Sequence, residues 1–137
     1  MFTTGYGEKN IKLPEGMNMI GYGARKGGAE GIHDRLKVKA LYFRSGEEEF
    51  ILIVCDLMGL SDDFIDQTSE EIENTSGVNK ENIVIAVTHT HSGPASMFVK
   101  NSGKLDKKWQ GDLKKKITEA AEQAWKNTDK SILNYNV

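Results

Sequence analysis

Three apolar-rich runs, separated by polar segments, predict three strands along this chain. They lie at 38–44, 50–56 and 83–87, and the second and third are apolar enough for strands that are buried on both faces. The first two runs are separated by the polar segment 45–48, which contains a glycine. Such a short polar turn between two strand patterns predicts an antiparallel hairpin.

Apolar residues three and four positions apart predict two helices. The first covers 64–72, with Ser61 as its N-cap and Gly77 at its end. The second covers 109–125, where tryptophan, leucine, isoleucine and alanine recur at helical spacing. The alternating segment 132–137 predicts a last strand, which we expect beside 83–87 through a right-handed parallel crossover.

The order of these elements predicts an α/β fold, a layered mixed β-sheet flanked by helices. The length of 137 residues favours a single domain over 1–137. Since the sequence stops within a strand pattern, we expect it to be part of a larger catalytic domain. We also expect an uncovered sheet edge or apolar face that promotes self-association.

Composition and charge exclude several classes of protein. The chain is 38% hydrophobic and 28% charged, as in globular proteins, and its net charge of −2 gives no basic footprint for nucleic acid. The longest apolar run, Phe50–Cys55, is too short to span a bilayer. No signal peptide is visible at residues 1–7, so we expect a cytoplasmic protein, or a secreted one if a signal has been removed. Several lysines lie in or beside the second predicted helix, at 107, 108, 114, 115 and 116. We expect them to form a face of the helix that is exposed to solvent.

Glycines are concentrated in the first part of the chain, with eight between residues 5 and 31. The spacing around Gly21-Tyr22-Gly23 is not that of a dinucleotide-binding loop, and no helix pattern follows it. We interpret this stretch as a loop whose backbone turns tightly or approaches a ligand.

The most specific motif is Thr88–Pro94, Thr-His-Thr-His-Ser-Gly-Pro, directly after the third predicted strand. We expect that strand to be central in the sheet. In an extended strand, His89 and His91 would project to the same side. Neutral imidazole is the commonest metal ligand and a ready proton carrier, so the pair is a candidate metal or catalytic site at the mouth of a cleft. A His-x-His pair is also common where both rings make ordinary hydrogen bonds.

Other polar residues have weaker claims to a site. His33 is a third imidazole, Asp56 could orient a histidine from behind, and Arg35 could hold a substrate oxygen. Each also has an ordinary interpretation: a loop histidine bonded to backbone, a polar residue that closes a strand, and a surface ion pair. Cys55 lies in an apolar run and is expected to be an inert buried thiol.

Together these segments resemble the amino-terminal catalytic region of the neutral/alkaline non-lysosomal ceramidases and their bacterial relatives. The resemblance covers roughly the first hundred residues. It rests on Gly31–Arg35 before one strand, Val54–Met58 at the end of the next, and Asn82–Pro94 with the histidine pair. Residues 2–23 also resemble the opening strand and Gly-Tyr-Gly loop of that family.

The resemblance implies zinc-dependent hydrolysis of an N-acyl amide bond, with a small-molecule or lipid substrate such as ceramide. It implies that His89 is a zinc ligand and that His91 lies beside the metal and acts on water or substrate. The remaining ligands of the family, a histidine, a glutamate and a tyrosine, are expected beyond residue 137. Bound zinc makes water a nucleophile near neutral pH and polarises the amide carbonyl.

Two alternatives stay open. A different metal hydrolase is one, although the residues after His91 are not those of a metallo-β-lactamase and the chain is too short for a barrel amidohydrolase. The other is a non-catalytic, truncated or degenerate domain that binds a ligand without turnover. Metal content of the purified protein would separate these possibilities.

Overall fold

A five-stranded sheet forms the centre of the molecule, in a computed structural model that describes residues 2–100, 104–132 and 134. Its strands lie in the order β5-β4-β3-β1-β7. Their bounds are Phe2–Asn10 for β1, Lys37–Ser45 for β3, Glu48–Cys55 for β4, Ile83–Val87 for β5 and Thr128–Ser131 for β7. Among these described strands only the β4–β5 pair is parallel, so the sheet is mixed, as the sequence predicts.

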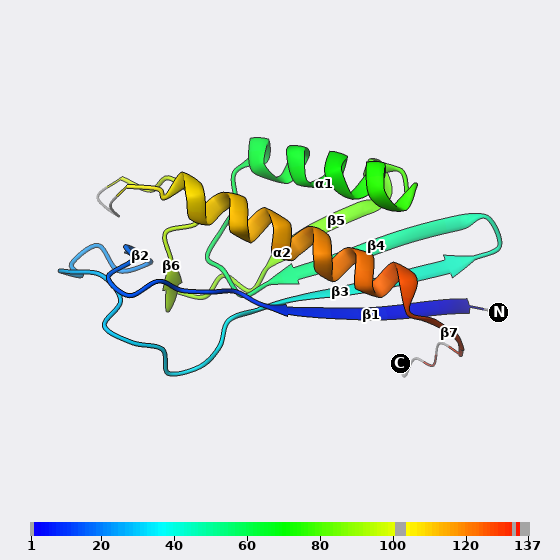
Figure 1. The fold of residues 1–137 in the computed structure, drawn as a ribbon, viewed down its shortest axis with the longest axis horizontal. Coiled ribbons are helices and arrows are strands. Elements are labelled where there is room, and N and C mark those ends of the chain that lie inside the picture. The colour runs from blue at the N-terminus through cyan, green and yellow to red at the C-terminus, as the bar shows by residue number, and fades with distance from the viewer. Residues whose placement is uncertain (1, 101–103, 133, 135–137) are drawn as a thin grey trace.

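Two helices cover one face of this sheet, α1 (Asp62–Ser76) and α2 (Lys107–Lys126) (Figure 1). The main core lies between the two layers. Its largest buried members come from the middle strands and from α2, such as Ile51, Ile53 and Ile117. A short 3-10 helix, η1 (Lys80–Asn82), leads into β5, and a separate two-stranded ribbon pairs β2 (Met19–Ile20) with β6 (Gly93–Pro94). None of the described helices combines the length and hydrophobicity needed to cross a membrane.

The first predicted helix, α1, begins and ends at the residues that the sequence predicts. Ser61 accepts a hydrogen bond from the Phe64 amide, and Gly77 closes α1 in the left-handed conformation with φ of 79°. The N-cap of α2 is Asp106, whose side chain accepts from the Trp109 amide. The hairpin of β3 and β4 is also as predicted.

Glycines in β1 allow α2 to lie against the sheet without side chains between them. A Cβ on Gly5 would be 1.9 Å from the Ala124 carbonyl oxygen, and one on Gly7 would be 2.0 Å from that of Ala120. Every other residue type is therefore excluded at these two positions without a shift of the helix. Our interpretation of the whole glycine-rich stretch as a loop is wrong here, because Gly5 and Gly7 are strand residues.

The face of the sheet opposite the helices is apolar and open within the described residues. Tyr6 lies between the two glycines that face α2, so its side chain points the other way. In the strand register Tyr6 pairs with Leu41, Leu41 with Leu52, and Leu52 with Val84, which places all four on this open face. Tyr6, Leu41 and Val84 are 47%, 38% and 42% exposed. Figure 1 shows both helices on the other side.

One prediction about strand position is wrong, and another falls mostly outside the described residues. The strand that precedes the histidine pair, β5, lies at an edge of the described sheet and not at its centre. The last strand of the described residues is Thr128–Ser131, which lies before the predicted segment, and it pairs antiparallel with β1 at the opposite edge from β5. The chain therefore returns from α2 to the β1 side of the sheet. Most of the predicted segment 132–137 lies outside the described residues.

Candidate metal site at the His89–His91 loop

The two histidines lie in a loop, whereas the sequence predicts them in extended backbone at the end of a strand. β5 ends at Val87, and His89 has a φ of 59°. His89 is the only described residue other than glycine with a positive φ. Such a conformation is costly for a residue with a Cβ and is found where surrounding contacts hold it, often at functional sites. The rings nevertheless lie together, with centroids 5.1 Å apart in an edge-to-face arrangement.

A backbone carbonyl fixes the orientation of His89. Its Nδ1 is 2.8 Å from the carbonyl oxygen of Met58. Since a carbonyl oxygen only accepts, Nδ1 must carry the hydrogen, which leaves the lone pair of the neutral ring on Nε2. This is the arrangement of most metal-bound histidines, in which the nitrogen away from the metal donates to a carbonyl or carboxylate.

His91 is held from its other side by the loop that follows β2. The ring of Tyr22 meets the His91 ring edge-on at 5.6 Å, and the Arg25 guanidinium lies 5.1 Å from the centroid of Tyr22. The backbone of Gly21 lies directly against His91. The contacts thus run in sequence from Arg25 through Tyr22 to the two histidines.

The small β2–β6 ribbon brings these two loops together. Met19 pairs with Pro94 and Ile20 with Gly93, and the Ala95 amide donates to the Asn18 carbonyl at 2.8 Å. The proline and glycine of the heptad thus belong to a strand pair. Because of this pairing, the segment before Gly21 is fixed beside the segment after His91.

Of the other candidates, Asp56 forms no hydrogen bond with either histidine ring within the described residues. Its Oδ2 accepts from the Lys37 amide at 2.9 Å, and the Asp56 amide donates to the Lys37 carbonyl at 2.9 Å. This pair closes the β3–β4 ladder, which agrees with the ordinary interpretation of Asp56 as a polar residue that ends a strand.

His33 and Arg35 lie on a different loop, and they line different cavities. His33 is 97% exposed, and its Nδ1 is 2.8 Å from Asp34 Oδ2. This hydrogen bond raises the pKa of the His33 imidazole. His33 and Asp34 share a cavity of about 440 Å³ with Thr90 and Ser92 of the histidine loop. Arg35 lines another cavity.

The cavity beside the histidine loop has a mixed apolar and polar lining. Leu13, Met19, Ile32 and Leu36 supply apolar walls, and the four polar residues named above, with Ala29 and Gly31, complete the lining. The sequence predicts that His89 and His91 open into a cleft. In the structure, their neighbours Thr90 and Ser92 line this cavity instead.

The donors present fit part of a zinc site. A catalytic zinc takes three protein ligands and keeps one open position. His89 offers Nε2, and His91 is adjacent. Within residues 2–100, 104–132 and 134, however, no three histidine, cysteine, aspartate or glutamate side chains lie close enough to hold a metal ion. The loop therefore offers an oriented imidazole pair that needs further ligands.

Sequence reasoning missed three contributors to this arrangement. Met58 acts through its carbonyl, so its side chain gives no signal. Gly21 and Tyr22 appear in the sequence only as a glycine-rich turn. The Gly-Tyr-Gly pattern was the one available clue, and its relation to His91 depends on the β2–β6 pairing.

Known proteins share both the sequence pattern and the fold. Residues 2–134 match the family described as neutral/alkaline non-lysosomal ceramidase, N-terminal. A neutral ceramidase from Mycobacterium tuberculosis is 32% identical over 82 residues, which are 56% of this chain and 13% of that protein.

Two solved structures resemble the chain over 93% of its length. One is a ceramidase described as complexed with C2, with 22% identity, a TM-score of 0.81 and 21% of its chain covered. The other is the neutral ceramidase from Pseudomonas aeruginosa, with 22% identity, a TM-score of 0.82 and 22% of its chain covered. The 137 residues thus span about a fifth of the length of these solved relatives. On the match over residues 2–134, the chain belongs to the neutral/alkaline non-lysosomal ceramidase family, in its N-terminal region.

Proposed function

We propose that this chain provides part of the metal site of a zinc-dependent hydrolase of the neutral ceramidase type, which cleaves an N-acyl amide bond with a metal-activated water. The observation that carries the proposal is the 2.8 Å contact between His89 Nδ1 and the Met58 carbonyl, which leaves Nε2 free for a metal. The membership of the chain in the ceramidase family supports the reaction class.

The two histidines take different roles in this proposal. His89 holds zinc through Nε2, because its other nitrogen is engaged by the Met58 carbonyl. Zinc, when bound, supplies Lewis acidity toward water and the amide carbonyl. His91, with its ring 5.1 Å from that of His89, accepts or donates the proton that amide cleavage requires.

The substrate proposed is a lipid or small-molecule N-acyl amide, of which ceramide is the example named by the family. The 440 Å³ cavity beside Thr90 and Ser92 has apolar walls, which suit a hydrocarbon chain better than a sugar or a nucleotide. Thr90 and Ser92 of the histidine loop supply part of its polar lining.

The test assays the gene product at its natural length, with and without zinc, for release of fatty acid from a short-chain ceramide. We expect His91→Ala to lower turnover by about 10²-fold or more, as loss of an acid–base group does, while Lys130→Ala, a change on β7 outside the cavity, leaves it nearly unchanged. Turnover that is equal in both variants would contradict the role of His91. We expect the 137-residue chain alone to show no measurable turnover, since its described residues offer too few ligands.

One observation favours a second candidate, a non-catalytic ligand-binding domain. No group of three metal donors occurs in the described part of the chain. Under this alternative, the natural-length protein would bind the short-chain ceramide without releasing fatty acid at any zinc concentration.

A further inference from the structure

A second cavity, apart from the histidine loop, is lined by cations. It measures about 450 Å³, and no acidic side chain of the described residues lines it. The cationic lining residues are Lys9, Lys12, Arg35 and Lys116, with Ile11 and Ile32 as apolar walls. Four positive side chains around one cavity are unexpected in a protein with a net charge of −2.

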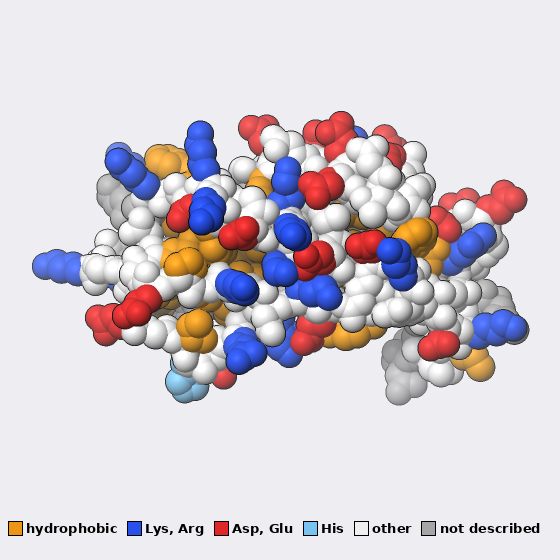
Figure 2. All heavy atoms as spheres, viewed as in Figure 1, with side chains coloured by type: hydrophobic (Ala, Val, Ile, Leu, Met, Phe, Trp, Pro, Cys, Tyr) orange, Lys and Arg blue, Asp and Glu red, His pale blue; other side chains and the backbone are white. Residues whose placement is uncertain are grey.

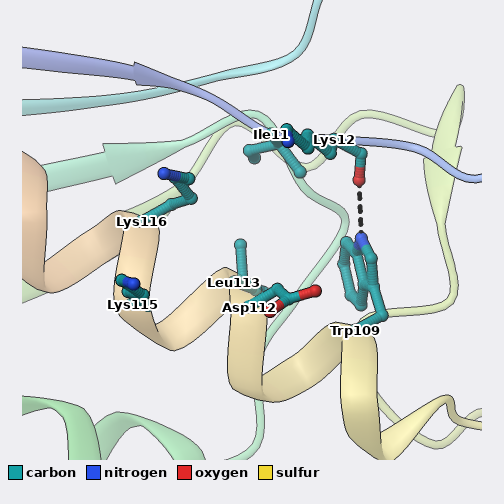
Figure 3. Close-up of a pocket in the computed structure, with 7 residues that line it drawn as sticks. All are labelled: Ile11, Lys12, Trp109, Asp112, Leu113, Lys115 and Lys116. Atoms are coloured by element: carbon teal, nitrogen blue, oxygen red, sulfur yellow. Dashed lines mark hydrogen bonds between the residues drawn. The ribbon is translucent and has the colours of Figure 1, made fainter.

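Backbone contacts hold the three contributing segments in place. The Ile11 amide donates to the Leu36 carbonyl at 2.8 Å, which ties the end of β1 to the loop that carries Arg35. The Trp109 indole donates to the Lys12 carbonyl at 2.7 Å, which ties the same segment to α2 (Figure 3). The cations therefore come from parts of the sequence that the fold brings together, not from one charged run.

A smaller cavity of about 220 Å³ adjoins the first and shares Ile11, Lys12 and Lys116 with it. In Figure 3, Lys116 projects from α2 on the side that faces the Ile11–Lys12 segment, and Lys115 lies beside it on the flank of the helix. One acidic residue, Asp112, also lines this smaller cavity. Figure 2 shows the wider setting, in which Lys and Arg side chains lie over the middle of α2 with Asp and Glu side chains among them.

The charges of this cluster are only partly neutralised. Lys116 pairs with Glu119 at 2.7 Å, whereas Lys9 donates to the neutral amide of Gln123 at 2.8 Å. Within the described residues, neither Lys12 nor Arg35 forms an ion pair. The hydrogen bond from Lys116 lowers the pKa of the Glu119 carboxyl, and the charges of Lys115 and Lys9 act in the same direction. The surroundings of Glu119 are thus positive.

We propose that the cavity lined by Lys9, Lys12, Arg35 and Lys116 binds the phosphate group of an anionic ligand. A guanidinium presents a planar fork of donors that matches phosphate oxygens, and ammonium groups add point charges that neutralise the anion. Ile11 and Ile32 offer apolar surface to the remainder of the ligand. The phosphate arrives free in solution or as the headgroup of a lipid, and the same side chains recognise both.

This site gives Arg35 a role that differs from the sequence-based hypothesis. Arg35 lines the cationic cavity, while the cavity beside the histidine loop is lined by the neighbouring His33, Asp34 and Leu36. Ile32 lines both cavities. The proposed phosphate site is therefore next to the cavity beside the histidine loop, but its chemistry requires no metal.

The test measures binding by the metal-free 137-residue chain. One arm titrates inorganic phosphate at low ionic strength. The other arm measures co-sedimentation with vesicles of phosphatidylcholine, with and without phosphatidylglycerol. The variants are Lys12→Gln/Arg35→Gln, which removes two cavity charges, and Lys39→Gln/Lys130→Gln, which removes two charges outside the cavity. Circular dichroism and thermal unfolding confirm that each variant is folded.

We expect the cavity variant to weaken saturable binding by about tenfold or more, as loss of charge-assisted hydrogen bonds does, and the matched control to bind nearly as well as wild type. Binding of phosphate alone identifies a free phosphate ligand, and binding of anionic vesicles alone identifies a lipid headgroup. Binding in neither arm, or equal weakening by both variants, would overturn the proposal. Lys9→Gln/Lys116→Gln gives a second cavity variant if the first fails to fold.

Discussion

Gly21 and His91 are in such close contact that only a glycine fits at position 21. A Cβ built on Gly21 would lie 2.7 Å from the Cβ and 2.8 Å from the Cα of His91, and Gly21 has a φ of 113°. Both the space and the backbone conformation therefore require glycine. This contact connects the glycine-rich segment to the histidine loop.

Replacement of Gly21 by alanine should displace His91 and separate the histidine rings. We expect Gly21→Ala to destabilise the protein by roughly 1–3 kcal/mol, from overpacking and backbone strain, and to weaken zinc binding in a calorimetric titration. Gly23→Ala is the matched control, since no described atom lies within 4 Å of its added Cβ. Equal zinc binding by wild type and Gly21→Ala would show that His91 does not depend on this contact.

Zinc binding by the isolated chain should be weak and should depend on His89. His89 alone is an incomplete ligand set, and high affinity requires the full set. We expect calorimetry to detect weak binding that His89→Ala abolishes and that His33→Ala, at an exposed histidine on another loop, preserves. Tight, stoichiometric binding that survives His89→Ala would place the metal elsewhere.

Gly7 and Gly111 should respond to alanine in opposite directions. A Cβ on Gly7 meets the Ala120 carbonyl oxygen at 2.0 Å, so Gly7→Ala should cost about 2 kcal/mol or more through separation of β1 from α2. No described atom lies within 4 Å of a Cβ on Gly111 inside α2, so Gly111→Ala should stabilise by roughly 0.5–1 kcal/mol. Urea denaturation measures both changes. A neutral Gly7→Ala would mean that α2 shifts freely against the sheet.

The Cys55 thiol should be unreactive in the folded protein, and its burial should make stability fall at high pH. Burial raises the pKa of Cys55 from 9.0 to about 12, and the neighbouring Asp56 charge adds to the rise. Between these values the folded state holds a proton that the unfolded state releases, so the free energy of unfolding decreases as pH rises above 9. Below that pH the contribution of the protonated Cys55 thiol to stability is fully present.

Urea denaturation between about pH 7 and 10.5 checks this decrease, and iodoacetamide labelling checks the reactivity. Cys55→Ala is the control, since it should remove the part of the decrease in unfolding free energy that the titration of Cys55 causes. Tyr42, whose pKa burial also raises to about 12, retains its own contribution in that variant. Rapid labelling of the native protein at about pH 8 would contradict the buried position of Cys55.

The open apolar face of the sheet should cause the chain to self-associate. Tyr6, Leu41 and Val84 are exposed on the strands of this face, and contiguous exposed apolar surface promotes association. We expect light scattering to show oligomers of the wild type, and Leu41→Lys/Val84→Lys to shift the protein toward monomer. Phe98→Lys changes a residue that is 74% exposed outside the sheet and should have little effect. A wild-type chain that stays monomeric at high concentration would refute this prediction.

The sequence by itself determined the elements of this protein. Hydrophobic periodicity located β3, β4, β5 and both helices, because burial of one face imposes a spacing that the residues must satisfy. Ser61 and Gly77 mark the ends of α1, since helix termini require local hydrogen-bond partners and a left-handed residue. The heptad that contains His89 and His91 also identified the family, because a motif of this kind consists of residue types at fixed spacing and needs no tertiary contact to be recognised.

The tertiary structure alone decided where these elements meet. Periodicity is a local property, so it did not reveal that β5 is an edge strand or that the last strand returns to β1. His89 and His91 are adjacent because of a left-handed backbone, a Met58 carbonyl and the β2–β6 ribbon, and not because of strand alternation. These contacts join segments that lie far apart in the sequence, and backbone groups, whose chemistry is the same in every residue, make several of them. For that reason no residue type in the sequence predicts these contacts.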